Sequence, residues 1–237
     1  TGRGGGPVTG TISLVPVTGL PENAPGDDLA GMIAEAADLA DGDVVVVTQK
    51  IVSKAEDRVV DIDLAVGHKR LVEAESVRVL RRRGDLVISE TEHGFVCANA
   101  GIDQSNIPDE DVVCLLPIDP DASARRISAE INAVTGVAHP IIIPDTFGRA
   151  WREGHVNFAI GVAGMDPLKD YRGTDDANGR ILHVTTIAVA DELAATAEMI
   201  TAKAINVPVA LIRGMPYRPD VGSTASLLRD RTRDMFR

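Results

Sequence analysis

Apolar positions along this chain follow helical spacing in some segments and form β-type runs in others. After Asp27 and Asp28, apolar residues recur at helical spacing, which predicts a helix capped by these aspartates. The β-branched run Val44–Val47 is typical of a buried strand. The same criteria predict further helices at 71–80, from Asp121 or Ser123 to Gly136, at 190–204 and at the C-terminus through Phe236, and strands at 86–89, 94–98, 112–115, 141–143, 183–187 and 207–212. The elements predict a mixed α/β (α+β) protein whose connections are too irregular for a simple Rossmann sheet.

Composition narrows the class of protein. The residues are 44% hydrophobic and 25% charged, as in a soluble globular protein, but only 3% aromatic, so the core must be mostly aliphatic. A formal net charge of -11 argues against nucleic acid as a partner, because its phosphates would be repelled. No apolar stretch approaches a membrane span, so no membrane association is expected. Cys97 and Cys114 lie in apolar runs outside any CxxC pair, which predicts buried thiols in a reducing, cytoplasmic compartment.

The chain shows no repeat and no obvious linker. Residues 1–10 are glycine-rich without an apolar signal segment, so we expect a flexible lead-in there. We expect residues 11–237 to form a single unit, with any division into two subdomains left open. The arginines at 81–83 follow the helix predicted at 71–80, where cations suit the helix dipole, so a solvated cap explains them better than a binding patch.

The segment Ile141–Gly154, IIIPDTFGRAWREG, combines more candidate chemistry than any other. Its apolar start predicts a buried strand ended by Pro144, which would leave Asp145 and Thr146 where the strand meets solvent. A carboxylate and a hydroxyl suit a hard cation, and the two arginines that follow suit anionic substrate groups. A polar turn with Asp145 as a cap and Trp151 in the core explains the same pattern equally well.

No phosphate-binding loop is present: GxxxxGK[ST] is absent, and no GxGxxG follows a predicted strand. A nucleotide would therefore be held by other residues, and candidates follow two predicted strands. Thr48–Lys54 offers hydroxyls, an amide and two ammonium groups, although surface lysines are usually only solvated. Ala100–Asn106 offers Asp103 for a metal and Asn106 for a base or sugar, while an Asx-turn is the interpretation that the local pattern favours.

Taken in order, these segments resemble a known family, the GTP-dependent coenzyme F420-0:gamma-glutamyl ligases. The likeness runs over almost the whole chain, through VTGLPENAPGDDL (17–29), DGDVVVVTQKIVSKAE (41–56), ANAGIDQSN (98–106), LLPIDPDASA (115–124), DTFGRAWREG (145–154), AIGVAGM (159–165), DYRGTDDANGR (170–180), VADELAATAE (189–198) and VALIRG (209–214). Each motif alone is weak, but the ordered series is specific. The chain resembles the ligase domain of the actinobacterial two-domain enzyme, and we expect either a free-standing ligase or a domain of a larger enzyme.

The resemblance implies a non-Rossmann ligase fold with mixed sheets, assembled as an intertwined homodimer. It places metal ligands on Asp103, Asp145 and Thr146, and the two aspartates are also expected to be catalytic. Guanine-nucleotide contacts fall on Leu20, Pro21, Glu22, Asn23, Gln49, Lys54 and Asn106. Gln49 stands where close relatives carry serine, which would alter that contact.

The resemblance also implies a reaction. The terminal carboxylate of the deazaflavin precursor coenzyme F420-0 attacks the γ-phosphate of GTP, the amine of L-glutamate displaces the resulting acyl phosphate, and further glutamates follow through γ-linkages. Two Mg²⁺ or Mn²⁺ ions per site, with K⁺ as a candidate accessory ion, would offset the repulsion between carboxylate and triphosphate. The implied partners are GTP, L-glutamate, coenzyme F420-0, a second copy of the chain, and a flavin nitroreductase-like domain, attached or separate.

Arg149 and Arg152 are assigned from their chemistry, not from the resemblance. Paired guanidiniums bind carboxylates bidentately, so we expect both arginines to act as catalytic residues that face the anionic acceptor or the glutamate carboxylates. Ion pairs with Glu153 or Asp170 are the alternative.

Two other functions remain open beside the ligase. The first is a non-catalytic guanine-nucleotide-binding module, against which the presence of all three candidate metal ligands argues. The second is a metal-dependent phosphohydrolase that uses Asp119 and Asp121 as a DxD pair, although Pro120 between them points to a turn before a helix. The ligase is therefore the preferred function.

Overall fold

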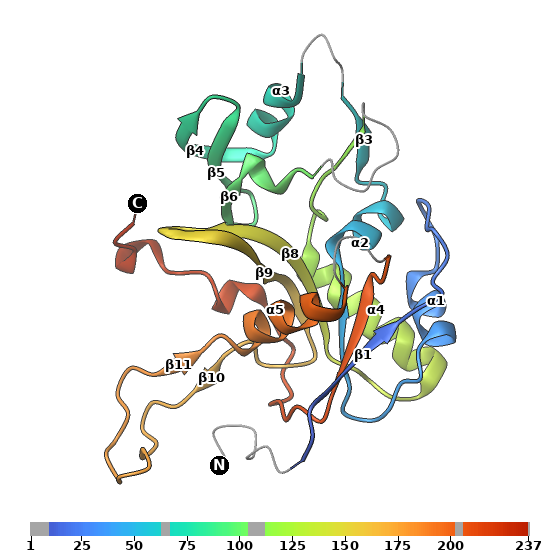
Figure 1. Ribbon diagram of the computed structural model, residues 1–237, viewed down its shortest axis with the longest axis vertical. Coiled ribbons are helices and arrows are strands. Elements are labelled where there is room, and N and C mark those ends of the chain that lie inside the picture. The colour runs from blue at the N-terminus through green and yellow to red at the C-terminus, as the bar shows by residue number, and fades with distance from the viewer. Residues whose placement is uncertain (1–9, 63–66, 104–111, 202–205, 237) are drawn as a thin grey trace.

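A five-stranded sheet forms the centre of the computed structural model, which describes residues 10–62, 67–103, 112–201 and 206–236 (Figure 1). The strand order is β1-β12-β2-β8-β9, with bounds β1 Ser13–Val17, β2 Val44–Val47, β8 Ile141–Arg149, β9 Arg152–Ala163 and β12 Val209–Arg213. β2 and β8 run parallel, with Val45 opposite Ile141, while the other neighbouring pairs in this sheet are antiparallel. This mixed sheet confirms the predicted mixed α/β, non-Rossmann class.

Helices cover both faces of the central sheet. Because side chains alternate along a strand, Val45 and Val47 of β2 face one side and Val44 and Val46 the other. The first side packs against α1 (Leu29–Ala36), α2 (Gln49–Ala55) and α4 (Pro120–Thr135), and the second against α5 (Val189–Thr201). All four valines are fully buried, which explains an uninterrupted apolar run where a half-exposed strand would alternate.

The two helix starts that the sequence marks are both capped by aspartate. Asp28 Oδ1 accepts a hydrogen bond from the Gly31 amide at 2.8 Å and begins α1, as predicted. The predicted α4 is present, but its start, expected at Asp121 or Ser123, lies one to three residues too late. Asp119 accepts from the Ala122 amide at 2.9 Å, so the helix begins earlier, at Pro120.

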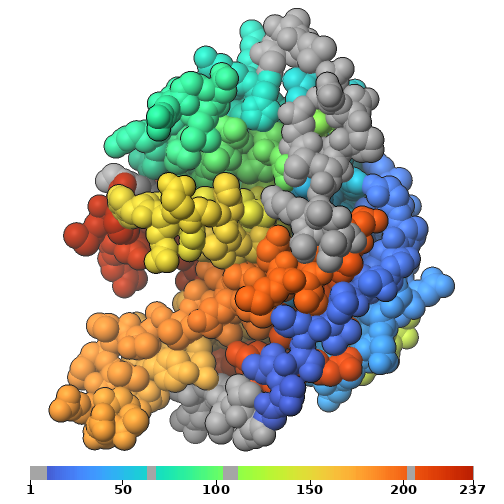
Figure 2. All heavy atoms as spheres, viewed as in Figure 1, coloured from blue at the N-terminus to red at the C-terminus, as the bar shows by residue number. Residues whose placement is uncertain are grey.

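Smaller sheets surround the centre (Figure 1). β3 (Val59–Asp61) pairs with β7 (Val112–Cys114), and β4 (Ser76–Arg83), β5 (Leu86–Thr91) and β6 (Val96–Ala98) form a three-stranded sheet beside α3 (Gly67–Ala74). β10 (Lys169–Asp170) and β11 (Thr186–Ile187) lie at the base of an arm that projects from the body (Figure 2). Short 3₁₀ turns lie at η1 (Asn99–Gly101), η2 (Thr224–Ser226) and η3 (Arg231–Arg233).

The helix predicted at 71–80 is wrong over its second half. α3 ends at Ala74, and the residues from Ser76 onward form β4, which pairs antiparallel with β5. The β-branched residues of this segment favour a strand once a partner strand is available. The arginines at 81–83 therefore lie in a strand and do not cap a helix, and Arg82 pairs with Glu73 at 2.9 Å.

The strand from Ile141 also differs from the prediction, because Pro144 does not end it. β8 continues through Pro144 to Arg149, paired with β9, with a register shift between Ile143 and Pro144. β2 pairs with β8 only at Ile141 and Ile142, so Pro144 lies beyond the two-sided part of the ladder, where its missing amide hydrogen is tolerated.

Trp151 does not lie in the core, which was one of its predicted places. It is 81% exposed at the turn between β8 and β9, where its φ is 59°. The C-terminal helix predicted through Phe236 is also wrong. Asp230 Oδ1 accepts from the Thr232 amide at 2.8 Å, and such local side-chain bonds compete with a helix, so only η2 and η3 form there.

The structure bears only in part on two further predictions, the flexible lead-in at the N-terminus and the lack of membrane association. The expected lead-in at 1–10 falls, apart from Gly10, outside the described residues. No helix within the described ranges is both long and apolar enough to cross a bilayer.

Candidate active site

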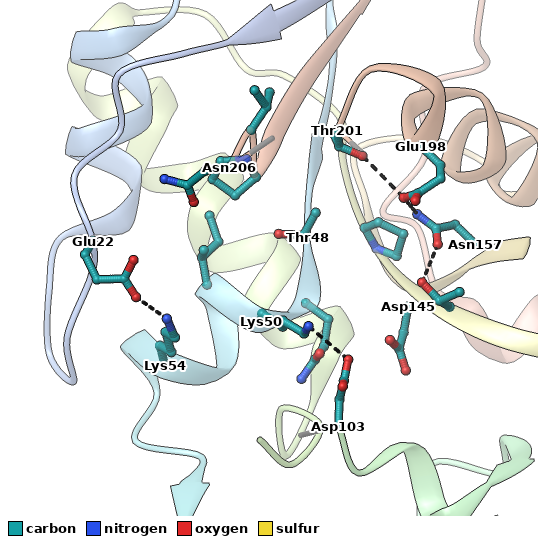
Figure 3. A pocket seen from close by; sticks show the side chains of 16 residues that line it. Glu22, Thr48, Lys50, Lys54, Asp103, Asp145, Asn157, Glu198, Thr201 and Asn206 are labelled. Atoms are coloured by element: carbon teal, nitrogen blue, oxygen red, sulfur yellow. Dashed lines mark hydrogen bonds and ion pairs between the residues drawn. The ribbon is translucent and has the colours of Figure 1, made fainter. Parts of the chain in front are cut away.

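A cavity of about 150 Å³ opens at the edge of the central sheet, where β2 ends and β12 begins (Figure 3). In open α/β sheets, ligands bind beyond the carboxyl ends of the parallel strands. The cavity lies beyond the end of β2, at Thr48 and Gln49, and beyond the part of β8 that pairs with β2, at Pro144 and Asp145. Its wall carries both signs of charge, from the carboxylates Glu22, Asp103, Asp145 and Glu198 and the ammonium groups Lys50 and Lys54.

The backbone of Asp103 is fixed to the strand β7. Its amide donates to the Cys114 carbonyl at 3.0 Å, and its carbonyl accepts from the Cys114 amide at 2.8 Å. The turn just before it, Asn99–Gly101, has positive φ at all three residues, which aims the chain back toward β7. The side chain then meets Lys50, with Nζ 3.1 Å from Asp103 Oδ2.

Asp145 and Thr146 are neighbours in β8, opposite Phe158 and Asn157 of β9. Both line the first cavity together with Asp103, so the structure brings the three predicted metal ligands to one place. The labelled side chains of Lys50, Asp103 and Asp145 face a common space (Figure 3). The alternative in which Asp145 caps a following segment does not hold, because β8 continues through it.

A second cavity, of about 220 Å³, adjoins the first and shares lining residues with it. Asp103, Asp145 and Thr146 line it too, together with Phe147, Gly148 and His155 and the turn at 98–102. The three predicted ligands therefore border two adjoining cavities.

Of the predicted nucleotide contacts, Glu22 and Lys54 line the first cavity and form an ion pair with each other. Asn23 is buried behind them, where its Nδ2 donates to the Ile51 carbonyl at 2.7 Å. Leu20 packs against the core, and the side chain of Pro21 is exposed to solvent. Asn106 lies outside the described residues.

Gln49 lines the first cavity but is only 2% exposed. Its Nε2 donates to Ser53 Oγ at 2.6 Å and to the Leu115 carbonyl at 2.9 Å. Both amide hydrogens therefore have partners inside the protein, so a nucleotide contact from this residue would have to use its oxygen.

Both cysteines are free and buried, as predicted. Burial raises the pKa of Cys97 to about 12, and the nearby charge of Asp145 contributes. Burial also raises the pKa of Cys114, on which hydrogen bonds from Gln49 and Ser53 act in the opposite direction. Both thiols are therefore neutral at physiological pH and serve as core side chains beside the carboxylates.

Arg149 and Arg152 face each other at the tip of the β8–β9 hairpin and line neither cavity. Arg149 Nη2 donates to the Glu153 carbonyl at 2.6 Å, which is a backbone contact rather than the alternative ion pair. Asp170 instead binds Arg172 at 2.8 Å. The expected contact of the two arginines with a substrate carboxylate stays a prediction.

Asp119 and Asp121, the pair that a phosphohydrolase would use, both have structural partners. Asp119 caps α4, and Asp121 accepts from Ser223 Oγ at 2.8 Å and from the Thr224 and Val162 amides at 3.0 Å and 2.8 Å. Neither residue lines the two cavities described above.

Comparison with known proteins decides the family. A sequence profile of the F420-0:Gamma-glutamyl ligase family matches residues 19–214. The chain belongs to this gamma-glutamyl ligase family. It is 43% identical to the coenzyme F420:L-glutamate ligase of Methanothermobacter thermautotrophicus, over 95% of this chain and 99% of that protein. The ligases of the same name from Methanopyrus kandleri and Methanocaldococcus jannaschii are 38% and 36% identical, over 96% and 89% of this chain and 98% and 90% of those proteins.

The donor atoms of this gamma-glutamyl ligase family member suit a hard divalent cation. Asp103, Asp145 and Thr146 offer only oxygen, and the Lys50 ammonium against Asp103 shows that one carboxylate already holds a positive charge here. Within the described residues, no three His, Cys, Asp or Glu side chains gather closely enough to form a complete metal site. Two carboxylates without a full cage are what Mg²⁺ needs when substrate phosphates and water supply the remaining ligands.

Three residues of the site have no sequence signal that singles them out. Lys50 is only one of two candidate ammonium groups in its segment, and the motifs give no role to Asn157 or Glu198, yet all three line the first cavity. The alternation of β9 could have suggested that Asn157 faces Thr146, but only the register of the hairpin establishes it.

Proposed function

We propose that this chain is a GTP-dependent ligase that joins L-glutamate to coenzyme F420-0 through an acyl phosphate, and adds further glutamates through γ-linkages. The observation that supports this most directly is that Asp103, Asp145 and Thr146 border both of two adjoining cavities. A ligase of this type must hold a triphosphate and an acceptor carboxylate on two sides of one reacting phosphorus. Membership in the gamma-glutamyl ligase family and the names of the relatives support the same reaction.

In this proposal the first cavity takes the nucleotide. Lys50 and Lys54 lie on its wall and place ammonium groups where phosphate oxygens need positive charge. Both lysines are held by carboxylates, Asp103 and Glu22, which position them before a nucleotide arrives. The second cavity, which shares Asp103, Asp145 and Thr146 with the first, then takes the acceptor carboxylate and the glutamate amine.

The bonds change in two steps. An oxygen of the acceptor carboxylate forms a bond to the γ-phosphorus while the bond from that phosphorus to the β–γ bridging oxygen breaks, which releases GDP. The neutral amine of glutamate then forms a bond to the acyl carbon while the carbon–oxygen bond to phosphate breaks. The proton that the amine loses passes to the departing phosphate, which is released as inorganic phosphate.

Divalent cations would be held by Asp103, Asp145 and Thr146. When bound, Mg²⁺ or Mn²⁺ supplies charge that offsets the repulsion between the two anionic reactants. The protein's own part is to hold the two reactants in line and to keep water from the acyl phosphate. A homodimer, K⁺ and a flavin nitroreductase-like partner stay predictions from the resemblance.

The decisive assay incubates the protein with GTP, Mn²⁺, L-glutamate and coenzyme F420-0 and measures the mass of the deazaflavin product. We expect increments of one or more glutamyl units, with GDP release that needs both the acceptor and glutamate. Asp145→Asn should abolish turnover while the protein stays folded. Asp85→Asn, in the exposed turn between β4 and β5, removes the same charge outside both cavities and should leave turnover unchanged. GTP hydrolysis without an acceptor would indicate a phosphohydrolase, and GDP binding without turnover a binding module, and either result would overturn the proposal.

A further inference from the structure

A line of hydrogen bonds connects Glu198 on α5 to Thr146 on β8 through Asn157 on β9 (Figure 3). Thr146 Oγ1 donates to Asn157 Oδ1 at 2.7 Å, and Asn157 Nδ2 donates to Glu198 Oε2 at 3.0 Å. Thr201 Oγ1 lies 3.4 Å from the same Glu198 oxygen. All four residues line the first cavity, so the line runs along its wall.

The carboxylate of Glu198 fixes the direction of each bond in this line. An ionised carboxylate only accepts hydrogen bonds, so it holds the Asn157 amide with the nitrogen toward Glu198 and the oxygen toward Thr146. Asn157 is only 4% exposed, and both ends of its amide have partners within the protein. The amide oxygen also only accepts, and the Thr146 hydroxyl must therefore direct its hydrogen at Asn157.

This polarity determines what Thr146 presents to the cavity. A hydroxyl that donates its hydrogen inward keeps its lone pairs for another partner, and a cation binds lone pairs. With the amide of Asn157 turned over, its NH₂ would face Thr146. The hydroxyl hydrogen would then point into the cavity, where it would repel a cation.

We propose that Glu198 and Asn157 are positioning residues that set the Thr146 hydroxyl as an acceptor for a divalent cation. This inference rests on the proposed function, which places such a cation at Asp145 and Thr146. Replacing a residue that forms a hydrogen bond to a metal ligand typically weakens metal binding by about 10- to 100-fold.

Direct Mn²⁺ binding is the measurement that tests the proposal, because it does not depend on turnover. Glu198→Gln replaces the carboxylate by an amide of the same shape, which allows the Asn157 amide to turn over. With GDP present and free Mn²⁺ read by electron paramagnetic resonance, we expect binding to weaken by about 10- to 100-fold. Glu192→Gln removes the same charge from the exposed first turn of α5 and should leave Mn²⁺ affinity unchanged.

A double-mutant cycle separates orientation from simple attraction, because Glu198 also attracts a cation through space. In Thr146→Val no hydroxyl remains to be oriented, so adding Glu198→Gln should cost little more. If Glu198→Gln weakens Mn²⁺ binding by the same factor with and without the Thr146 hydroxyl, the charge alone acts and the proposal is overturned.

Asn157→Leu provides an independent version of the test if Glu198→Gln fails to fold. It breaks the line but keeps the charge of Glu198, so the proposal expects most of the same loss, and unchanged binding would overturn it. Failure here is distinguishable from failure of the proposed function. A wild-type protein that binds Mn²⁺ and turns over, with a Glu198→Gln variant that binds equally well, would overturn the positioning role alone. A wild-type protein that binds no Mn²⁺ would overturn both.

Discussion

Replacement of Lys50 by methionine should change the affinities for cation and for nucleotide in opposite directions. Lys50 Nζ lies 3.1 Å from Asp103 Oδ2, with the two side chains 19% and 23% exposed. A divalent ion that binds Asp103 must displace or crowd this ammonium, so the lysine competes with the metal. In the proposed function the same ammonium is one of two that face the phosphates of the nucleotide in the first cavity, so its loss should weaken nucleotide binding.

The size of the competition can be estimated from the geometry. At an effective dielectric constant of about 20, unit charges 3.1 Å apart attract by about 5 kcal/mol before desolvation. Solvent-exposed ion pairs contribute only about 0.2–1 kcal/mol of net stabilisation. Because the Lys50–Asp103 pair is partly buried, we take its net attraction as about 1–2 kcal/mol. Lys50→Met should therefore tighten Mn²⁺ binding by about 5- to 30-fold. A hydrogen bond from a charged donor contributes about 1.5–3 kcal/mol, so GTP binding should weaken by about tenfold or more.

Two titrations measure these effects. Mn²⁺ binding without nucleotide is followed by electron paramagnetic resonance, and GTP binding in saturating Mg²⁺ by calorimetry. Lys69→Met, on the exposed surface of α3, removes the same charge outside both cavities and should change neither affinity. If Lys50→Met loses affinity for both ligands, Lys50 serves to hold Asp103 in place, and the argument from competing charges is refuted.

Three further predictions concern stability, measured by urea unfolding. Arg213 binds the buried Asp43 carboxylate through two nitrogens. Burial acts to raise the pKa of Asp43, but the hydrogen bonds, above all those from Arg213, lower it overall. Arg213→Met should therefore lower the free energy of unfolding by about 3 kcal/mol at pH 7, and this loss should shrink as the pH falls below about 4, where Asp43 takes up a proton. An equal loss at pH 3.5 and pH 7 would contradict this. Burial raises the pKa of Asp191, so Asp191→Asn should stabilise the protein at pH 7, with the gain disappearing toward acid pH; a loss at pH 7 would contradict it. A Cβ at Gly161 would lie 2.4 Å from the Pro120 carbonyl oxygen, so Gly161→Ala should cost about 1–3 kcal/mol, and unchanged stability would contradict that steric account.

The parts of the fold that the sequence predicted are those where local and tertiary preferences agree. Val44–Val47 is β-branched and buried on both faces, and Asp28 caps α1 where the apolar spacing begins. Residues 76–80 show the opposite case, because their partner strand β5 overrides a helical pattern. The prediction that Pro144 ends its strand was wrong for a similar reason. β2 does not pair with β8 at Pro144, so the missing amide hydrogen is tolerated there, and only the pairing of the sheet shows this.

The candidate site was predictable only in part. An ordered series of motifs marks Asp103, Asp145 and Thr146, and the structure brings all three to the border of the same two cavities, but the charged residue Glu198 had no such signal. The hydrogen-bond line behind Thr146 was not predictable, because it depends on the β8–β9 register and on where α5 packs. Buried amides such as Asn157 carry no local pattern that distinguishes them from surface asparagines.

The residues shared by the two cavities also have a thermodynamic consequence. Because Asp103, Asp145 and Thr146 border both spaces, a ligand in one alters the field and the packing felt by a ligand in the other. If nucleotide and acceptor occupy the two cavities as proposed, the linkage is reciprocal: the factor by which bound nucleotide changes acceptor affinity equals the factor by which bound acceptor changes nucleotide affinity. Such coupling needs no movement of the backbone, because it acts through side chains that both ligands meet.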